Sequence, residues 1–217
     1  MSSNLEQKST NSASVQDIPA NKPKRKKEGL SDLSFIFLFL PALILTVGCL
    51  TVFVFQAYQV DGPSMETTLY NNNRLIVWKL PRTWARITGH QYVPKRGDII
   101  VFSANMLASY GQGANKQLIK RVIGLPGDHL VIKNGFVAIY NKQNPRGFDP
   151  DKTLAYGRVI PITTGNIDIT IPSNQIFVMG DNRSDSLDSR VFGTIPTNSI
   201  VGQLVLRMLP ANQIKAF

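Results

Sequence analysis

The strongest pattern in the chain is one long apolar run, after which apolar and polar residues alternate over short distances. The run covers residues 35–55, FIFLFLPALILTVGCLTVFVF, and contains no charged side chain. As a helix rising ~1.5 Å per residue it is about 31 Å long, the thickness of a bilayer core. We therefore predict a transmembrane anchor over residues 33–57. A cleaved secretory signal is the main alternative, but its apolar region is shorter, about 7–15 residues.

The segments on either side of this run differ strongly in composition. Residues 1–32 are rich in Ser, Asn, Gln and Lys and end in a basic cluster at 22–27, KPKRKK. Such a segment has little to bury, so we predict a disordered tail. Because basic residues beside a span stay in the cytoplasm, we expect a single-pass membrane protein with a cytoplasmic N-terminus. Residues 58–217 would then form an extracytoplasmic domain.

Beyond residue 58 the pattern is typical of short strands joined by turns. Asn134-Gly135 joins two alternating segments and predicts a two-residue hairpin. We expect a mainly β domain of folded antiparallel sheets, with a less certain insert near 141–175. The expected strands are residues 74–78, 99–102, 116–124, 129–133, 136–140, 158–163, 166–171, 175–179 and 199–208.

Residues 78–90, WKLPRTWARITGH, combine two tryptophans with basic residues. Aromatic and basic side chains together favour the headgroup layer of a membrane. A loop that buries two core tryptophans is the other interpretation, and the sequence leaves both open.

The net charge of +10 changes the picture only slightly. The basic residues are scattered among the expected strands without a nucleic-acid-binding motif, so we expect no nucleic-acid partner and favour anionic lipid. The acid-rich segment 180–190 lacks the Gly and the terminal Glu of a calcium loop. We therefore predict no metal and no cofactor.

Candidate chemistry begins at Ser64, which stands on a Gly62-Pro63 turn directly after the apolar run. A serine hydroxyl is a poor nucleophile without a neighbouring base. The chain has two histidines, His90 and His129, and neither stands in a recognisable triad setting.

Lys120 is the alternative base. In the strand 116–124 it shares one face with Leu118 and Val122. Desolvation on an apolar face lowers the pKa of a lysine, so a neutral amine can accept the serine proton. The competing interpretation is a snorkelling edge-strand lysine that protects the sheet from aggregation.

The segment 180–190, GDNRSDSLDSR, lies between two apolar stretches although it is rich in charges and hydroxyls. An Asp188–Arg190 or an Asp181–Arg183 pair could hold this loop through charge-assisted hydrogen bonds. Ser186 or Ser189 could orient a lysine amine.

Taken in order, these segments resemble the type I signal peptidases, which are membrane-anchored Ser/Lys endopeptidases. The resemblance covers most of residues 35–205. Its motifs are the anchor, Gly62-Pro-Ser-Met65, Lys95-Arg-Gly-Asp-Ile-Ile-Val-Phe102, Lys120-Arg-Val-Ile-Gly-Leu-Pro-Gly-Asp128, Gly180-Asp-Asn-Arg183 and Asp188-Ser-Arg-Val-Phe-Gly193.

The resemblance implies an enzyme of the inner (plasma) membrane that removes signal peptides from exported preproteins through an acyl-enzyme. Ser64 would be the nucleophile, its backbone N–H would contribute to the oxyanion hole, and Lys120 would be the general base. The substrate would add as a strand beside residues 58–64 and 117–120. The supporting residues implied are Ser186 for the lysine amine, and Asp188, Arg190, Asp181 and Arg183 for the loop. The implied pocket residues are Met65, Leu69, Leu118 and Ile119.

Two positions depart from the family pattern. Position 62 is Gly, where some members have a Ser that assists the oxyanion hole, and position 67 is Thr instead of the usual Pro. The alternatives are therefore a narrow-specificity Ser/Lys peptidase and a non-catalytic, membrane-tethered binding domain of the same fold.

Overall fold

The computed structural model describes residues 29–110, 116–154 and 160–217. The chain divides into two units, residues 1–43 and residues 44–217. Helix α1 (Gly29–Cys49) begins in the first unit and ends in the second, and it contains Pro41. The first 28 residues of the predicted tail lie outside the described part.

Helical backbone continues from α1 through η1 (Leu50–Val54) and ends there. Residues 55–57, predicted as the last part of the anchor, instead belong to strand β1 (Phe55–Gln59), which pairs with β2 (Arg74–Trp78). Within the described residues, no helix reaches the length and hydropathy that a membrane crossing requires. The transmembrane anchor therefore stays a prediction.

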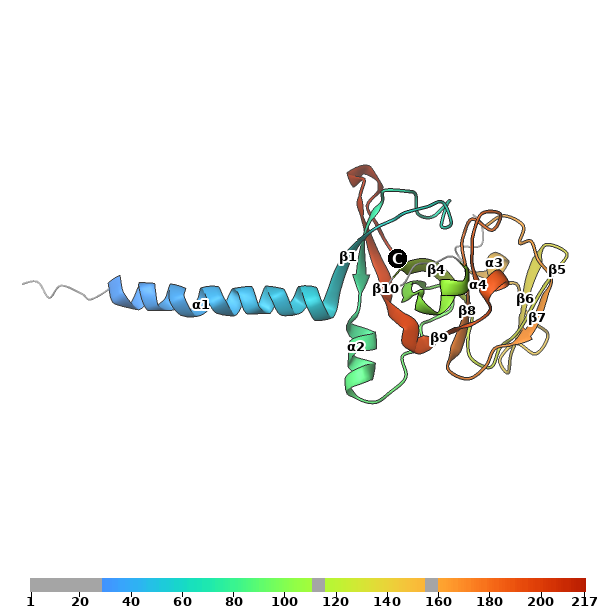
Figure 1. Cartoon of the computed structure of the whole chain (residues 1–217), viewed down its shortest axis with the longest axis horizontal. Helices are drawn as coiled ribbons and strands as arrows, with labels where there is room; N and C mark the ends of the chain where they lie inside the picture. The colour runs from blue at the N-terminus through green and yellow to red at the C-terminus, as the bar shows by residue number, and fades with distance from the viewer. Residues whose placement is uncertain (1–28, 111–115, 155–159) are drawn as a thin grey trace, which may run out of the picture. The chain divides into compact units, whose positions relative to one another are not determined.

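The second unit is built on a large antiparallel sheet, which confirms the mainly β prediction (Figure 1). Its strand order is β1-β2-β10-β3-β4-β8-β9, and β11 pairs with β10. Strand β10 thus lies between β2 and β3, although both are far from it along the chain. Besides β1 and β2, the strands of this sheet are β3 (Ile99–Ser103), β4 (Gln117–Gly124), β8 (Gln175–Met179), β9 (Ile195–Pro196), β10 (Ile200–Leu209) and β11 (Lys215–Ala216).

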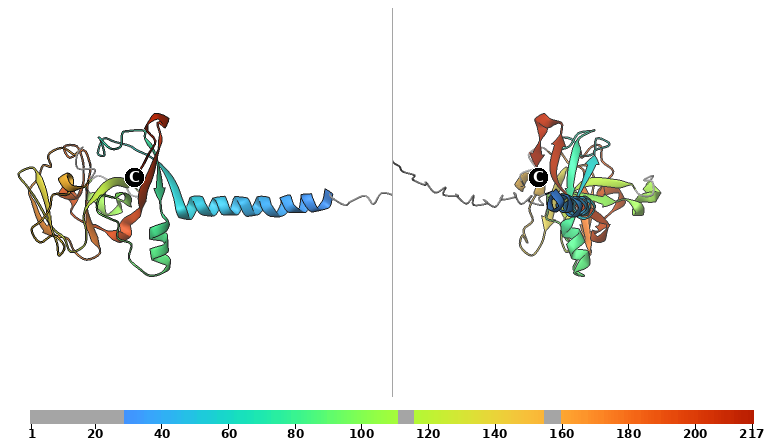
Figure 2. Two further views of the ribbon diagram at one scale, coloured as in Figure 1. Left: turned by 180° about the vertical axis from the view of Figure 1, so that it is seen from behind. Right: turned by 90° about the vertical axis from the view of Figure 1, so that its left-hand side faces the viewer.

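A smaller sheet with the order β6-β5-β7 forms a separate layer at one end of this unit (Figures 1 and 2). Its strands are β5 (His129–Lys133), β6 (Phe136–Tyr140) and β7 (Ile167–Thr170). The predicted hairpin is confirmed, and both turn residues have positive φ, 53° at Asn134 and 86° at Gly135. Only a few residue types adopt that backbone readily, which explains the Asn-Gly pair.

The apolar faces of the two sheets close the core between them. The shared cluster joins Ile123, Phe177 and Met179 of the large sheet to Leu130, Ile139 and their neighbours in the small one. A second cluster lies along β3, β4 and β8, and a third fills the space below the turn that carries Ser64.

Short helical segments complete the second unit. They are α2 (Leu80–Ile87), η2 (Asn105–Tyr110), α3 (Pro150–Thr153), α4 (Ser189–Phe192), η4 (Thr197–Ser199) and η5 (Ala211–Gln213).

One open alternative and one expectation about local structure differ from what the structure shows. Residues 80–87, for which a loop was one interpretation, form α2; Pro81 fits its first turn, where no backbone donor is needed. Residues 160–163 of the expected strand 158–163 form no strand, and residues 155–159 lie outside the described part. The Thr163 side chain instead accepts a hydrogen bond from Arg183. The segment therefore contacts the loop 180–190 and does not pair in a sheet.

Candidate active site

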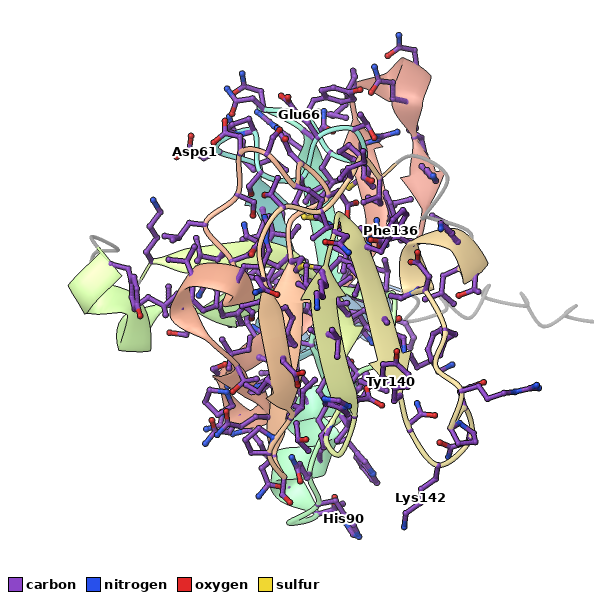
Figure 3. All side chains as sticks on the ribbon, turned by 90° about the vertical axis from the view of Figure 1, so that its right-hand side faces the viewer. Asp61, Glu66, His90, Phe136, Tyr140 and Lys142 are labelled. Carbon is purple, nitrogen blue, oxygen red and sulfur yellow. The ribbon has the colours of Figure 1, made fainter. Side chains whose placement is uncertain are left out.

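Ser64 stands on a tight turn directly after β1. Gly62 has φ +98°, a backbone conformation that side chains disfavour, and this position therefore suits glycine. The turn closes through a hydrogen bond of 3.0 Å from the Glu66 N–H to the Pro63 carbonyl. Asp61 and Glu66, which flank the turn, lie together at one end of the domain (Figure 3).

Below the turn, Met65 and Leu69 anchor it in the core. Both side chains are completely buried and pack with Val60, Leu75 and Leu204. The prediction that Met65 and Leu69 form substrate pockets is corrected accordingly, because neither side chain has surface that a peptide could contact. They hold the turn that carries Ser64 in place from the inside.

Lys120 approaches Ser64 from strand β4. Its Nζ lies 2.7 Å from the Ser64 Oγ and donates a second hydrogen bond of 3.0 Å to the Ile119 carbonyl. The lysine is 3% exposed. Alternation along β4 sends the next side chain, Arg121, to other partners, as the period of a strand requires.

Burial lowers the pKa of the Lys120 amine from 10.5 to about 8, because the charged form loses its hydration. The carboxylates of Asp188 and Asp181 act in the opposite direction, and the neighbouring charge of Lys116 lowers the pKa further. A substantial fraction of the amine is therefore neutral near pH 8. A neutral amine at 2.7 Å can accept the proton of the serine hydroxyl.

The loop 180–190 is held by a carboxylate at its far end. Asp188 is fully buried and accepts hydrogen bonds from the Arg190 Nε and Nη2 atoms, at 2.9 and 2.8 Å. The same carboxylate accepts the Gly180 N–H at 3.0 Å and so joins both ends of the loop. The Ser189 hydroxyl accepts the Val178 N–H at 3.0 Å.

The other expected pair of this loop does not form. Asp181 binds Arg121, whose Nε donates to Oδ1 at 2.7 Å, and it also accepts the hydroxyl of Thr68. Arg183 is buried and binds the carboxylate of Asp151 with both terminal nitrogens. The Asp181–Arg183 pairing is thus wrong, because each charge has a partner on a different element.

Gly180 and Asn182 hold the loop against the turn that carries Ser64. The Asn182 N–H donates to the Ser64 carbonyl at 3.1 Å, and its side-chain amide donates to the Pro63 carbonyl at 3.3 Å. A Cβ on Gly180 would lie 2.3 Å from both the Ser64 carbonyl oxygen and the Ser186 Oγ. Only glycine permits this approach.

Ser186 lies beside the same turn, because a Cβ on Gly180 would meet both its Oγ and the Ser64 carbonyl oxygen. Its Oγ is buried and has no hydrogen-bond partner among the described residues, so no bond joins it to Lys120 in this structure. Its role in orienting the amine stays a prediction.

A cleft of about 260 Å³ opens beside Ser64 and Lys120. It runs between the end of β1 and the start of β4, and Ser64, Lys120, Leu118 and Ile119 are among its lining residues. Two expected pocket residues are thus in the cleft, while Met65 and Leu69 are behind it. In the described ranges, no three His, Cys, Asp or Glu side chains gather to hold a metal ion.

The sequence comparisons identify the family. Residues 33–209 match the model of "Signal peptidase, peptidase S26". The chain belongs to this signal peptidase family. It is 36% identical over 197 residues to signal peptidase I P of Bacillus subtilis subsp. natto, covering 90% of this chain and 97% of that protein. It is 37% identical over 179 residues to signal peptidase I of Bacillus caldolyticus, covering 78% and 88%.

A solved signal peptidase I from Enterococcus faecalis V583 is 28% identical, with a TM-score of 0.40, and matches 53% of this chain and 99% of its own.

The sequence analysis missed several residues around this candidate site. The sequence signal for Arg121 was available, since an arginine inside a buried strand needs a carboxylate. Asp151 and Thr163 gave no such signal, because they lie in the insert, far along the chain from the loop that they support. Thr68 and Asn182 are polar residues of ordinary turns, and their roles depend on tertiary contacts.

Proposed function

We propose that Ser64 is the nucleophile of this signal peptidase and Lys120 its general base. The family assignment makes the chain a serine endopeptidase that removes signal peptides. The observation that supports the two roles is the 2.7 Å contact between Lys120 Nζ and Ser64 Oγ at the wall of an open cleft. A buried lysine of lowered pKa beside a serine is the arrangement that Ser/Lys catalysis needs.

The first half of the reaction forms an ester. Neutral Lys120 takes the hydroxyl proton while Ser64 Oγ attacks the carbonyl carbon of the scissile peptide bond. The tetrahedral intermediate then collapses, and the lysine ammonium gives its proton to the departing amine. The products are an acyl-enzyme on Ser64 and the free N-terminus of the mature protein.

The second half regenerates the enzyme. Lys120 accepts a proton from water, which attacks the ester, and the proton returns to Ser64 as the signal peptide leaves as a carboxylic acid. The Ser64 N–H would donate to the oxyanion. The cleft between β1 and β4 would take the signal peptide as an added strand, with Leu118 and Ile119 in contact with its small side chains.

We further propose that the enzyme acts from a membrane. The apolar run 35–55 is long enough to span the hydrocarbon core, and KPKRKK at 22–27 favours a cytoplasmic N-terminus. The catalytic domain would then lie on the extracytoplasmic side of the plasma membrane, where exported preproteins emerge.

The test uses the full chain in detergent with a preprotein that carries an Ala-x-Ala site. We expect the wild type to release the mature protein, and both Ser64→Ala and Lys120→Ala to abolish cleavage while keeping a folded domain by circular dichroism. Cleavage that survives either substitution would refute the proposed roles. A wild type that leaves several such preproteins intact would favour a binding domain of the same fold.

A further inference from the structure

The segment that begins at Ser64 is held at its C-terminal end by an arginine from another strand. Arg207 lies near the end of β10, and its Nη1 donates a hydrogen bond of 2.9 Å to the Thr68 carbonyl. In Figures 1 and 2 the end of β10 lies beside the teal segment that follows β1. Arg207 therefore contacts the segment 64–69 from a part of the sheet that is separate from the loop 180–190.

The same guanidinium also holds the segment that follows β10. Its Nε donates a hydrogen bond of 2.7 Å to the carbonyl of Gln213, the last residue of η5. In the described part of the chain Arg207 forms no ion pair. Both partners are backbone carbonyls, and hydrogen bonds from a charged donor are stronger than neutral ones. The side chain thus works as a bridge between two backbone segments.

Hydrogen bonds provide the restraint on the outer side of Thr68. A cavity of about 430 Å³ lies there, and Thr68, Arg121 and Lys215 are among its lining residues. Groups at the wall of a cavity have no packing partners on that side. The Thr68 hydroxyl donates to Asp181, and the Thr68 carbonyl accepts from Arg207. Two bonds from different elements therefore fix this residue where packing does not.

A shift of Thr68 would reach the nucleophile through the backbone. The Thr68 N–H donates a hydrogen bond of 2.9 Å to the carbonyl of Met65, the residue directly after Ser64. Movement of the Thr68 peptide would therefore disturb the peptide unit beside Ser64. A displacement of about 1 Å in a reacting group costs about 10²-fold in rate.

We propose that Arg207 is a positioning residue of this signal peptidase. Its bond to the Thr68 carbonyl holds Ser64 at the distance from which Lys120 takes the hydroxyl proton. The inference rests on the roles proposed above for Ser64 and Lys120. Neither Arg207 nor Thr68 lines the peptide cleft. Arg207 therefore acts on the rate of acylation and leaves the binding of the signal peptide unchanged.

The variant that isolates this bond is Arg207→Gln. The glutamine amide nitrogen occupies the position of the arginine Nε, so it keeps a donor for the Gln213 carbonyl. It ends before the position of Nη1, so the bond to Thr68 is lost. The full chain is used in detergent, in excess over a preprotein with an Ala-x-Ala site, and the cleavage rate constant of a single turnover is measured at saturating enzyme.

This measurement separates positioning from stability. At saturation the rate constant is that of the folded enzyme, so a residue that only stabilises the fold would leave it unchanged. We expect Arg207→Gln to lower the rate constant about tenfold, less than a full 1 Å displacement because Asp181 still holds the Thr68 hydroxyl. The half-saturating concentration of folded enzyme, with the folded fraction taken from circular dichroism, should not change.

Lys215→Met is the matched control. Lys215 pairs with Arg207 across β10 and β11, so the substitution removes a positive charge from the same place without removing a bond to Thr68. Its rate constant should equal that of the wild type. A wild-type rate constant in Arg207→Gln would overturn the inference, as would an equal loss in Lys215→Met.

Arg207→Lys provides a second variant. Its ammonium is about one bond shorter than the arginine Nη1, so its rate constant should lie between those of the wild type and Arg207→Gln. If Arg207→Gln does not fold, Arg207→Lys decides, and a wild-type rate constant there would overturn the inference. Ser64→Ala is measured alongside. Cleavage that survives Ser64→Ala would refute the proposed nucleophile, whereas a wild-type rate in Arg207→Gln of an enzyme that needs Ser64 would refute the role of Arg207 alone.

Discussion

Both terminal nitrogens of the Arg183 guanidinium donate to the carboxylate of Asp151, each at 2.5 Å. Arg183 is buried, and its Nε also donates to the Gly180 carbonyl at 3.1 Å. The insert between β6 and β7 therefore holds the loop that presses against Ser64. A segment that the family motifs do not cover thus supports the proposed active site.

Removing the Asp151 carboxylate should destabilise this enzyme strongly. Asp151→Ala leaves a buried guanidinium without its counter-charge, and we expect a loss of about 3 kcal/mol in the free energy of unfolding, measured by urea denaturation. Asp151→Glu should recover part of the loss. Asp185→Ala is the control, because this exposed aspartate lies in the supported loop itself. Equal stability of Asp151→Ala and Asp185→Ala would contradict the structural role.

Cleavage should rise with pH through the pKa of Lys120. The proposed base is the neutral amine, so we expect activity above the pKa of about 8 and its loss as protonation proceeds below that value. We expect kcat/KM to fall about tenfold for each pH unit well below that value. The measurement is a pH profile on a peptide substrate between about pH 5 and pH 10. A flat profile would exclude a lysine base.

Lys116 offers a sharper version of the same test. Its charge lowers the pKa of Lys120, so Lys116→Gln should raise that pKa and move the profile to higher pH. A profile that does not move, or that moves to lower pH, would contradict this electrostatic coupling. The exposed Lys142→Gln serves as a control for general loss of charge.

Lys120 should also reduce stability at neutral pH. Its pKa is about 8 in the folded protein and near 10.5 when solvated, so below pH 8 the folded state bears the full cost of a buried charge. Lys120→Met should therefore be more stable than the wild type at pH 7, with a free energy of unfolding about 1–3 kcal/mol higher. Between about pH 8 and 10.5 the unfolded wild type binds more protons, so wild-type stability rises and the difference shrinks. Denaturation at pH 7 and pH 10 checks the sign; a larger difference at pH 10 would refute it.

Gly180 should tolerate no side chain. A Cβ there would lie 2.3 Å from the Ser64 carbonyl oxygen and from Ser186 Oγ. Gly180→Ala must displace the nucleophile turn, and such a shift costs about 10²-fold in kcat/KM. Gly48→Ala is the matched control, since nothing lies within 4 Å of the added methyl group. Comparable activity of the two variants would contradict the close approach.

The sequence by itself predicted the fold class and singled out Ser64 and Lys120 as the candidate nucleophile and base. Alternation of apolar residues predicted most strands to within a residue, because one face of each strand must be buried. Asn134-Gly135 predicted its hairpin, since few residues accept positive φ twice in succession. Lys120 among Leu118 and Val122 indicated a desolvated amine, because burial of a charge is unfavourable wherever its partner lies.

Only the tertiary structure decided which groups meet. The sequence suggested that Asp181 pairs with Arg183. In the folded protein Asp181 pairs with Arg121 and Arg183 pairs with Asp151, because pairing depends on which strands and loops lie side by side. The tertiary structure also decided that the apolar side of α2 faces outward, because among the described residues its exposed apolar side chains have no side of the core beside them. Sequence patterns report what a side chain requires, a partner or a dry surface. Contacts between residues far apart in the chain determine where that requirement is satisfied.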